Sequence, residues 1–317
     1  MKEKRFKNTD WIVLLISLAL LGIGLVALYS ATQNTQLDEF KKQIQWALFS
    51  IPFILLVYFI DYKLIVKFSP AGYIIFIALL VGVLFTKPIN GARSWYKIGR
   101  IIAIQPSELA KIIVIMFMSF ILYKLQLKGK REINKPWKLL VYFVFWGIPI
   151  FLIYKQPDLG TAISYATAML FMLFVSGLDK KYMAIAIIIV VLCTPYVVQK
   201  LPQHARDRIE IFKDPESDPR GLGYNLIQSK LAIGAGQFLG MGLLKGNQTQ
   251  LGYLSPKTTD FIYSVIGEEM GFVVSGTIVV LYVILITKAI GIGKNAEDSI
   301  GSYIATRNCR YILFPYG

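Results

Sequence analysis

The sequence has few cysteines, few histidines and few charged residues. It contains two cysteines and one histidine among 317 residues, and only 17% of its residues are charged. Two cysteines cannot form a disulfide framework or a cysteine-rich metal site, and one histidine excludes the common histidine-cluster zinc sites. The low charge, together with 55% hydrophobic residues and a mean hydropathy of +0.56, excludes a soluble domain with a water-covered surface. These absences leave a polytopic membrane protein.

Apolar runs separated by charged clusters predict the membrane spans. A spanning helix needs about 20 mostly apolar residues, and runs of that length favour helices over a transmembrane barrel. The first run follows four basic residues, as in a signal peptide, but its 21 residues exceed the usual apolar core of about 7–15. It is therefore expected to be a retained span. We predict an all-α polytopic membrane protein with about eight transmembrane helices, at residues 11–31, 44–60, 65–85, 106–126, 139–154, 160–177, 182–198 and 261–287.

The distribution of Lys and Arg predicts the orientation. With a cytoplasmic N-terminus, the short segments on the inner side carry 16 Lys and Arg, against 7 in the short segments outside. This asymmetry is the one that the positive-inside rule describes. Segment 199–260 is then one long extracytoplasmic loop. Its basic residues are left out of the count, because long loops obey the positive-inside rule poorly.

The basic residues have two explanations. The net charge of +15 arises largely from the cytoplasmic clusters, which are expected to lie against anionic membrane lipid headgroups. No nucleic acid partner is expected. A second basic set lies in segments predicted to be outside, where an anionic ligand would account for it; its members are Arg93, Lys97, Arg100, Arg206 and Arg208.

Ionisable residues within or beside the spans mark candidate functional positions, because they are costly in a membrane. Glu108 and Lys111 lie three residues apart on one helix face, so they form either an internal ion pair or a pair whose Lys111 also lines a polar cavity. Asp158 follows a Gln-Pro pair and is expected to cap a helix, with a cavity-facing role as the alternative.

A third group of carboxylates follows the long loop. Asp260 falls at the outer boundary of the last span, where a functional carboxylate and a helix cap are both open interpretations. Glu268 and Glu269 lie roughly two turns deeper, at about 1.5 Å per residue. Capping does not explain two adjacent carboxylates at that depth.

The long loop is too patterned to be a linker. It contains a turn-rich stretch at 214–224, then Gln228 and Ser229, then a glycine-dense run at 234–246 that permits re-entrant or tightly packed backbone. The glycine spacing does not match a dinucleotide-binding fold. His204 is expected to be a solvated loop residue.

The ordered motifs resemble the SEDS family (shape, elongation, division and sporulation), most closely its rod-shape-determining branch. The resemblance runs from about Asp10 to Tyr303. It is carried by Asp10-Trp11, Tyr29-Ser30-Ala31-Thr32, Asn90-Gly91-Ala92-Arg93-Ser94-Trp95, Gln105-Pro106-Ser107-Glu108-x-x-Lys111, Gln156-Pro157-Asp158-x-Gly160-Thr161, Asp214-Pro215, Gly221-x-Gly223-Tyr224, Gln228-Ser229, Thr259-Asp260-Phe261-Ile262 and Gly267-Glu268-Glu269-x-Gly271-Phe272.

The resemblance implies an inverting peptidoglycan glycosyltransferase of the bacterial cytoplasmic membrane. Such an enzyme polymerises lipid II, an undecaprenyl-diphosphate-linked disaccharide peptide, on the outer face during cell-wall elongation, with a class B penicillin-binding transpeptidase as its partner. The family's essential carboxylate belongs to a Thr-Asp-Phe motif, which corresponds to Asp260 here. A carboxylate can take the proton of the acceptor hydroxyl. A divalent cation such as Mg²⁺ is a possible aid, although no all-protein metal cage is visible.

The resemblance also suggests roles for other residues. Basic side chains would offset the charge that grows on the diphosphate. The substrate-binding candidates are Arg93, Lys111, Glu108, Arg208, Gln228 and Ser229, and the structural or cavity carboxylates are Asp158, Glu268 and Glu269.

The sequence departs from the family near its end. Members of the family are expected to have ten spans, whereas this sequence no longer resembles the family after Tyr303. The predicted organisation is a transmembrane domain at 1–303 and a divergent tail at 304–317, as in a truncated or frame-shifted product, for which inactivity is one expectation.

Two rival functions remain open. A lipid II flippase would also place polar residues within a helical bundle, but it needs them through the full membrane depth, whereas here they gather in the outer half. A non-catalytic scaffold that recruits the transpeptidase is the other alternative.

Overall fold

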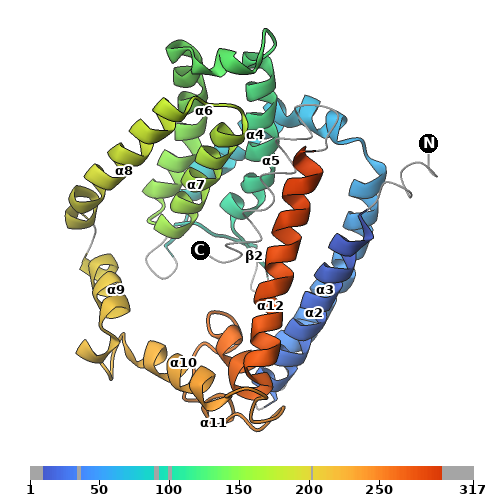
Figure 1. Ribbon diagram of the computed structural model, residues 1–317, viewed down its shortest axis with the longest axis vertical. Coiled ribbons are helices and arrows are strands. Elements are labelled where there is room, and N and C mark those ends of the chain that lie inside the picture. The colour runs from blue at the N-terminus through green and yellow to red at the C-terminus, as the bar shows by residue number, and fades with distance from the viewer. Residues whose placement is uncertain (1–9, 34–36, 89–92, 99–101, 201–202, 295–317) are drawn as a thin grey trace. The chain divides into compact units, whose positions relative to one another are not determined.

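A computed structural model describes residues 10–33, 37–88, 93–98, 102–200 and 203–294 (Figure 1). The tail predicted at 304–317 lies outside these residues. The chain forms two compact units. Unit 1 comprises residues 1–54 and 189–285, and unit 2 comprises residues 55–188 and 286–317.

All eight predicted spans are helices, which confirms the all-α polytopic class. Five of them are long and apolar enough to cross a membrane by length and composition, namely α2, α3, α4, α6 and α12. The eight helices are α2 (Trp11–Thr32), α3 (Asp38–Phe59), α4 (Tyr62–Val83), α5 (Pro106–Leu125), α6 (Pro136–Lys155), α7 (Leu159–Val175), α8 (Lys180–Lys200) and α12 (Ile262–Lys294).

Two connecting segments contain more secondary structure than the sequence predicted. The segment before α5 holds a short antiparallel pair, β1 (Tyr96–Ile98) and β2 (Ile102–Ile104), too short to show a strand pattern in the sequence. Among its described residues, the predicted long loop 199–260 also contains short helical segments. The sequence pattern did not reveal them, because they are short and Gly and Pro residues interrupt them. They are α9 (Gln203–Lys213), η2 (Pro215–Ser217), α10 (Tyr224–Ala235) and α11 (Asn247–Gln250).

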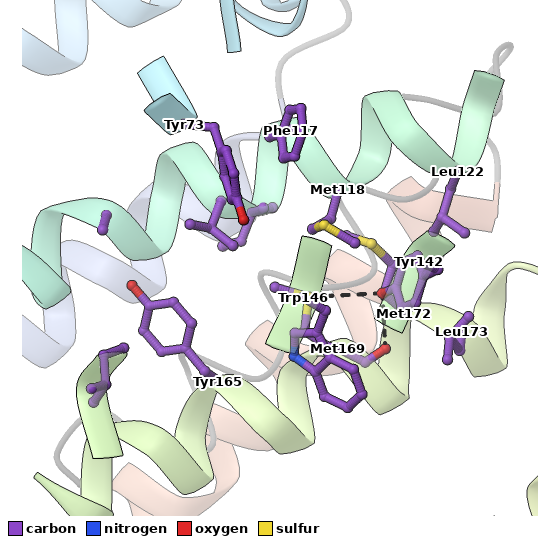
Figure 2. Packing of buried hydrophobic residues seen from close by; sticks show 14 of the residues in the cluster. Tyr73, Phe117, Met118, Leu122, Tyr142, Trp146, Tyr165, Met169, Met172 and Leu173 are labelled. Atoms are coloured by element: carbon purple, nitrogen blue, oxygen red, sulfur yellow. Dashed lines mark hydrogen bonds between the residues drawn. The ribbon is translucent and has the colours of Figure 1, made fainter. Parts of the chain in front are cut away.

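Unit 2 is built around α5, which packs against α4 and α6. Its interior is apolar, and Figure 2 shows side chains of α4 to α7 meeting there. Tyr73 stacks on Phe117 with ring centroids 4.2 Å apart. The hydroxyl of Tyr142 donates to the Met169 carbonyl (3.2 Å), and that of Tyr165 donates to the Ser107 carbonyl (2.6 Å). Buried tyrosines thus keep their polar ends satisfied in an apolar interior.

In unit 1, α2 packs against the first half of α12. Ala27 forms an apolar cluster with Ile266 and Ile278, and Ala31 forms a second one with Val265. Ala27 and Ala31 are four positions apart, so they lie on one face of α2, and both are fully buried.

The helix α12 is broken at Gly271, whose φ of 73° and ψ of −174° are not helical. In a regular helix the N–H groups of Phe272 and Val273 would donate to the carbonyls of Glu268 and Glu269. Here they donate instead to the carbonyls of Gln237 and Phe238, at 2.9 and 3.2 Å. The break therefore frees two donors and two acceptors of α12.

The segment after α10 satisfies the freed acceptors as well. The N–H groups of Met241 and Gly242 donate to the carbonyls of Glu268 and Glu269, at 2.9 and 3.0 Å. Backbone polar groups in a membrane protein must find internal partners, and a discontinuous helix is stable only where another segment supplies them. The tightly packed backbone predicted for the glycine-dense run is confirmed.

Candidate active site

Asp260 lies two residues before the start of α12, in unit 1, and its side chain is exposed. The first turn of α12 is capped by backbone groups: the Phe261 carbonyl accepts from the N–H groups of Ser264 and Val265 at 2.9 and 3.2 Å. Within the described part of the chain, the Asp260 carboxylate makes no hydrogen bond or ion pair. The helix-cap interpretation therefore does not fit, and the carboxylate is available for chemistry.

Glu268 is fully buried and binds the first turn of α11. One oxygen accepts from the Gln248 N–H (2.7 Å), and the other accepts from both the N–H (3.0 Å) and the hydroxyl (2.7 Å) of Thr249. The expectation that capping does not explain this carboxylate was wrong, because Glu268 caps a different helix. The sequence hides this role, since α11 has only four residues.

Glu269 is also buried and faces α2. Its Oε1 accepts from the side-chain amide of Gln250 (2.9 Å), which also donates to the hydroxyl oxygen of Ser30 at 3.0 Å. The same amide thus joins α11, α12 and α2. Both carboxylates hold elements of unit 1 together. Of the structural and cavity roles that the sequence left open, these contacts favour the structural role.

The two polar candidates on α10 have different environments. Ser229 shares a hydrogen bond of 2.7 Å with Ser264 of α12, so its hydroxyl joins two helices. That Ser229 binds substrate stays a prediction, because a hydroxyl with one hydrogen bond can still accept another. Gln228 is half-buried beside it, and Arg208 is exposed on α9.

In unit 2, Asp158 caps α7 as predicted. Its Oδ1 accepts from the Thr161 N–H (3.1 Å), and its Oδ2 accepts from the side-chain amide of Gln105 (2.7 Å). Gln105 immediately precedes α5, so this carboxylate also ties together the N-termini of two helices. Capping is confirmed.

Glu108 and Lys111 form the predicted ion pair on α5, with 2.6 Å between Oε1 and Nζ. The Lys111 side chain is 14% exposed and that of Glu108 is 50% exposed. Arg93 is held nearby in the same unit: its N–H donates to the Gln156 carbonyl (3.3 Å) and its Nη1 donates to the Leu84 carbonyl (3.4 Å). Unit 2 therefore collects three of the sequence motifs at one end of α5.

We expect Glu108→Ala to lower the yield of folded protein, because it removes the carboxylate partner of a largely buried ammonium. For a fully buried pair the loss is about 3–5 kcal/mol, and the half-exposed Glu108 makes it smaller here. The double variant Glu108→Leu/Lys111→Leu is expected to recover yield, measured by size-exclusion chromatography in detergent, but not the activity that the family resemblance implies. Full activity of the double variant would reduce the pair to a packing role.

Several polar residues of these sites were missed from the sequence. Gln156 is fully buried and its side-chain amide donates to the Leu80 carbonyl (3.2 Å). Its position in the Gln-Pro-Asp motif could have identified Gln156 from the sequence. Nothing in the sequence indicated the roles of Lys257, Thr249 and Gln250. Thr249 and Gln250 bind carboxylates of α12, and Lys257 binds the Thr249 carbonyl in α11. Among the described residues, no group of three His, Cys, Asp or Glu side chains could hold a metal ion.

The fold and these sites define a helical polytopic membrane protein with an exposed carboxylate just before α12 that makes no hydrogen bond or ion pair among the described residues. The family model of the FtsW/RodA/SpoVE cell cycle proteins matches residues 10–315. The chain belongs to this family, which is the SEDS family that the motifs resembled.

Similar proteins agree with the family. The peptidoglycan glycosyltransferase MrdB of Escherichia coli is 35% identical over 314 residues, which cover 98% of this chain and 82% of MrdB. A chain from a structure titled for the coordination of polymerization and crosslinking by a peptidoglycan synthase complex is 24% identical, with a TM-score of 0.78 over 96% of this chain and 84% of its own length. The rod shape determining protein RodA of Thermus thermophilus is 21% identical, with a TM-score of 0.68 over 96% of this chain and 82% of its own length. These two structures support the fold.

Proposed function

We propose that this chain is an inverting peptidoglycan glycosyltransferase, which polymerises lipid II into glycan strands during cell-wall elongation. Membership of the family and the 35% identity to a peptidoglycan glycosyltransferase support the reaction class. The observation that carries the proposal is the exposed Asp260 carboxylate, which makes no hydrogen bond or ion pair among the described residues. A general base must be free to meet its substrate.

The chemistry follows from that carboxylate. Asp260 takes the proton from the 4-hydroxyl of the acceptor sugar while that oxygen attacks the anomeric carbon of the donor. A new carbon–oxygen bond forms as the bond to the diphosphate breaks, and attack from the opposite face inverts the anomeric centre. The leaving group carries away the electron pair as undecaprenyl diphosphate.

Cationic groups would stabilise the charge that develops on the diphosphate. Arg208 is an exposed cation of unit 1, whereas Arg93 and Lys111 are held by backbone and ion-pair contacts in unit 2. Arg208 is the proposed diphosphate ligand in the same unit as Asp260, whereas diphosphate binding by Arg93 and Lys111 stays a prediction from the family resemblance. A divalent cation such as Mg²⁺ is proposed as an aid held chiefly by substrate phosphates and one carboxylate, which is how proteins commonly bind it.

Partners follow from the same proposal. Lipid II is the substrate, and a class B penicillin-binding transpeptidase crosslinks the strands that this chain makes. A fold similar to that of a chain in a synthase complex that coordinates polymerization and crosslinking supports such a partner.

The proposed location is the bacterial cytoplasmic membrane, with the N-terminus in the cytoplasm and Asp260 outside. In a variant whose own cysteines are replaced by serine, Glu216→Cys should react with an impermeant thiol reagent in intact cells, whereas Lys128→Cys should react only after lysis. Both side chains are exposed, so their reactivity reports sidedness. The reverse pattern would overturn the orientation and place Asp260 on the cytoplasmic side.

One assay separates this function from its rivals. The purified chain, labelled lipid II and the cognate transpeptidase are incubated in liposomes, and glycan strands are resolved on gels with and without a chelator. A polymerase makes strands, a flippase moves lipid II across the bilayer without making polymer, and a scaffold binds the transpeptidase but does neither. Loss of polymer on chelation, restored by Mg²⁺, would support the cation.

A further inference from the structure

The segment that leads into Asp260 is attached to α12 through α11. Glu268, eight residues beyond Asp260, has no exposed surface, so it has no access to a substrate that approaches from outside unit 1. All three donors that it accepts from belong to Gln248 and Thr249. The carboxylate therefore joins α12 to the start of the chain segment that ends at Asp260.

Glu268 takes the place of the cap that α11 lacks. The N-cap residue of α11 is Gly246, which has no side chain to accept from the first-turn amides. A Cβ at Gly246 would lie 2.6 Å from Oε2 of Glu268, so a side chain there would displace the carboxylate. The absence of a side chain at position 246 is what lets Glu268 reach the helix.

Lys257 continues the connection from α11 toward Asp260. Its Nζ donates to the Thr249 carbonyl at 2.7 Å. Burial lowers the pKa of Lys257, and the negative charge of Glu269 opposes this shift. An ammonium that is partly desolvated beside a carboxylate is held by electrostatic attraction as well as by its hydrogen bond.

We propose that Glu268 and Lys257 are positioning residues for Asp260, linked through Thr249. The proposal rests on the proposed function. The Asp260 carboxylate has no hydrogen bond of its own among the described residues, so its position depends on the backbone on each side. On one side that backbone enters α12, and on the other it is tied through Lys257 to Thr249, which Glu268 holds. A base displaced by about 1 Å can lose about 10²-fold in rate, so this attachment matters for catalysis.

The first test replaces Lys257 by methionine, which keeps the chain length but removes the ammonium. We expect kcat for glycan synthesis to fall about 10–100-fold while KM for lipid II is unchanged, because the base is misplaced but substrate binding is intact. Lys257→Arg, which keeps a donor and the charge, should recover most of the rate. Lys230→Met removes an exposed lysine of α10 and serves as the matched control, with parental kinetics.

Two further measurements separate positioning from other roles. In the Asp260→Asn background, Lys257→Met should cause no additional loss, since there is no base left to position. Parental kcat in Lys257→Met, or a higher KM with unchanged kcat, would overturn the proposal, the second result by showing direct substrate binding. A loss of rate that Lys257→Arg does not recover would also contradict it.

A measurement that does not depend on enzyme activity tests whether Glu268 holds α11. Thr249→Val removes the hydroxyl bond but keeps the backbone amide, and Glu268→Gln replaces an acceptor by a donor that faces other donors. Both should accelerate amide hydrogen exchange in the peptide that covers 247–250 relative to the parent. Unchanged exchange in both would show that Glu268 does not hold α11. If the parent makes no polymer at all, the proposed function fails while this result stands, so the two failures are distinguishable.

Discussion

Asp260→Asn should reduce glycan-strand formation by about 10²–10⁴-fold, the usual contribution of a general base. The amide keeps the shape of the side chain but cannot accept the proton of the acceptor hydroxyl. Because the Asp260 carboxylate is exposed and makes no hydrogen bond within the described residues, the substitution removes no contact that holds the fold. Folded yield and lipid II binding should therefore remain near those of the parent, while polymer on gels is lost.

The matched control is Glu216→Gln in the same unit. Glu216 is also exposed, and its carboxylate takes no part in the capping of η2, which Asp214 provides. The control removes the same charge and should polymerise lipid II at the parental rate. Polymer made at the parental rate by Asp260→Asn would eliminate the base assignment, whereas equal losses in both variants would point to a general charge effect.

Gly271→Ala should prevent unit 1 from folding normally. The φ of 73° and ψ of −174° at Gly271 belong to a region that only glycine adopts readily, with strain of about 1–3 kcal/mol for other residues. A Cβ would also lie 2.2 Å from the Gly240 nitrogen and 2.5 Å from the Leu239 carbonyl carbon. These are backbone atoms that cannot rotate away, and overpacking adds about 1–3 kcal/mol. The sum is a large part of the usual stability of about 5–15 kcal/mol.

The measurement is the thermal unfolding midpoint and the folded yield in detergent, beside the control Gly276→Ala. Gly276 lies in the same helix, where a Cβ would meet only ring carbons of Phe272 at 3.9 Å. The control should keep or slightly raise the midpoint, since alanine is favoured over glycine inside a helix by roughly 0.5–1 kcal/mol. Equal midpoints for both variants would mean that the native helix has no break at Gly271.

Much of the candidate site was visible in the sequence. The span predictions held because the length of an apolar run and the cost of a buried charge are properties of the local chain. Asp158 was expected to cap a helix and does so, since the Thr161 amide that it binds is only three residues away. The ion pair of Glu108 and Lys111 followed from the same local geometry.

The sequence by itself therefore determined the membrane class, the eight long helices, the family and the position of Asp260 just before α12. Only the tertiary structure decided what Glu268, Glu269 and Ser229 do, because each binds a group 19 or more residues away along the chain. The break at Gly271 likewise exists because a distant segment supplies four backbone hydrogen bonds in place of two helical ones. A hydropathy pattern records which residues avoid water. It does not record which distant donor will meet which acceptor, since that depends on how the packed helices bring them together.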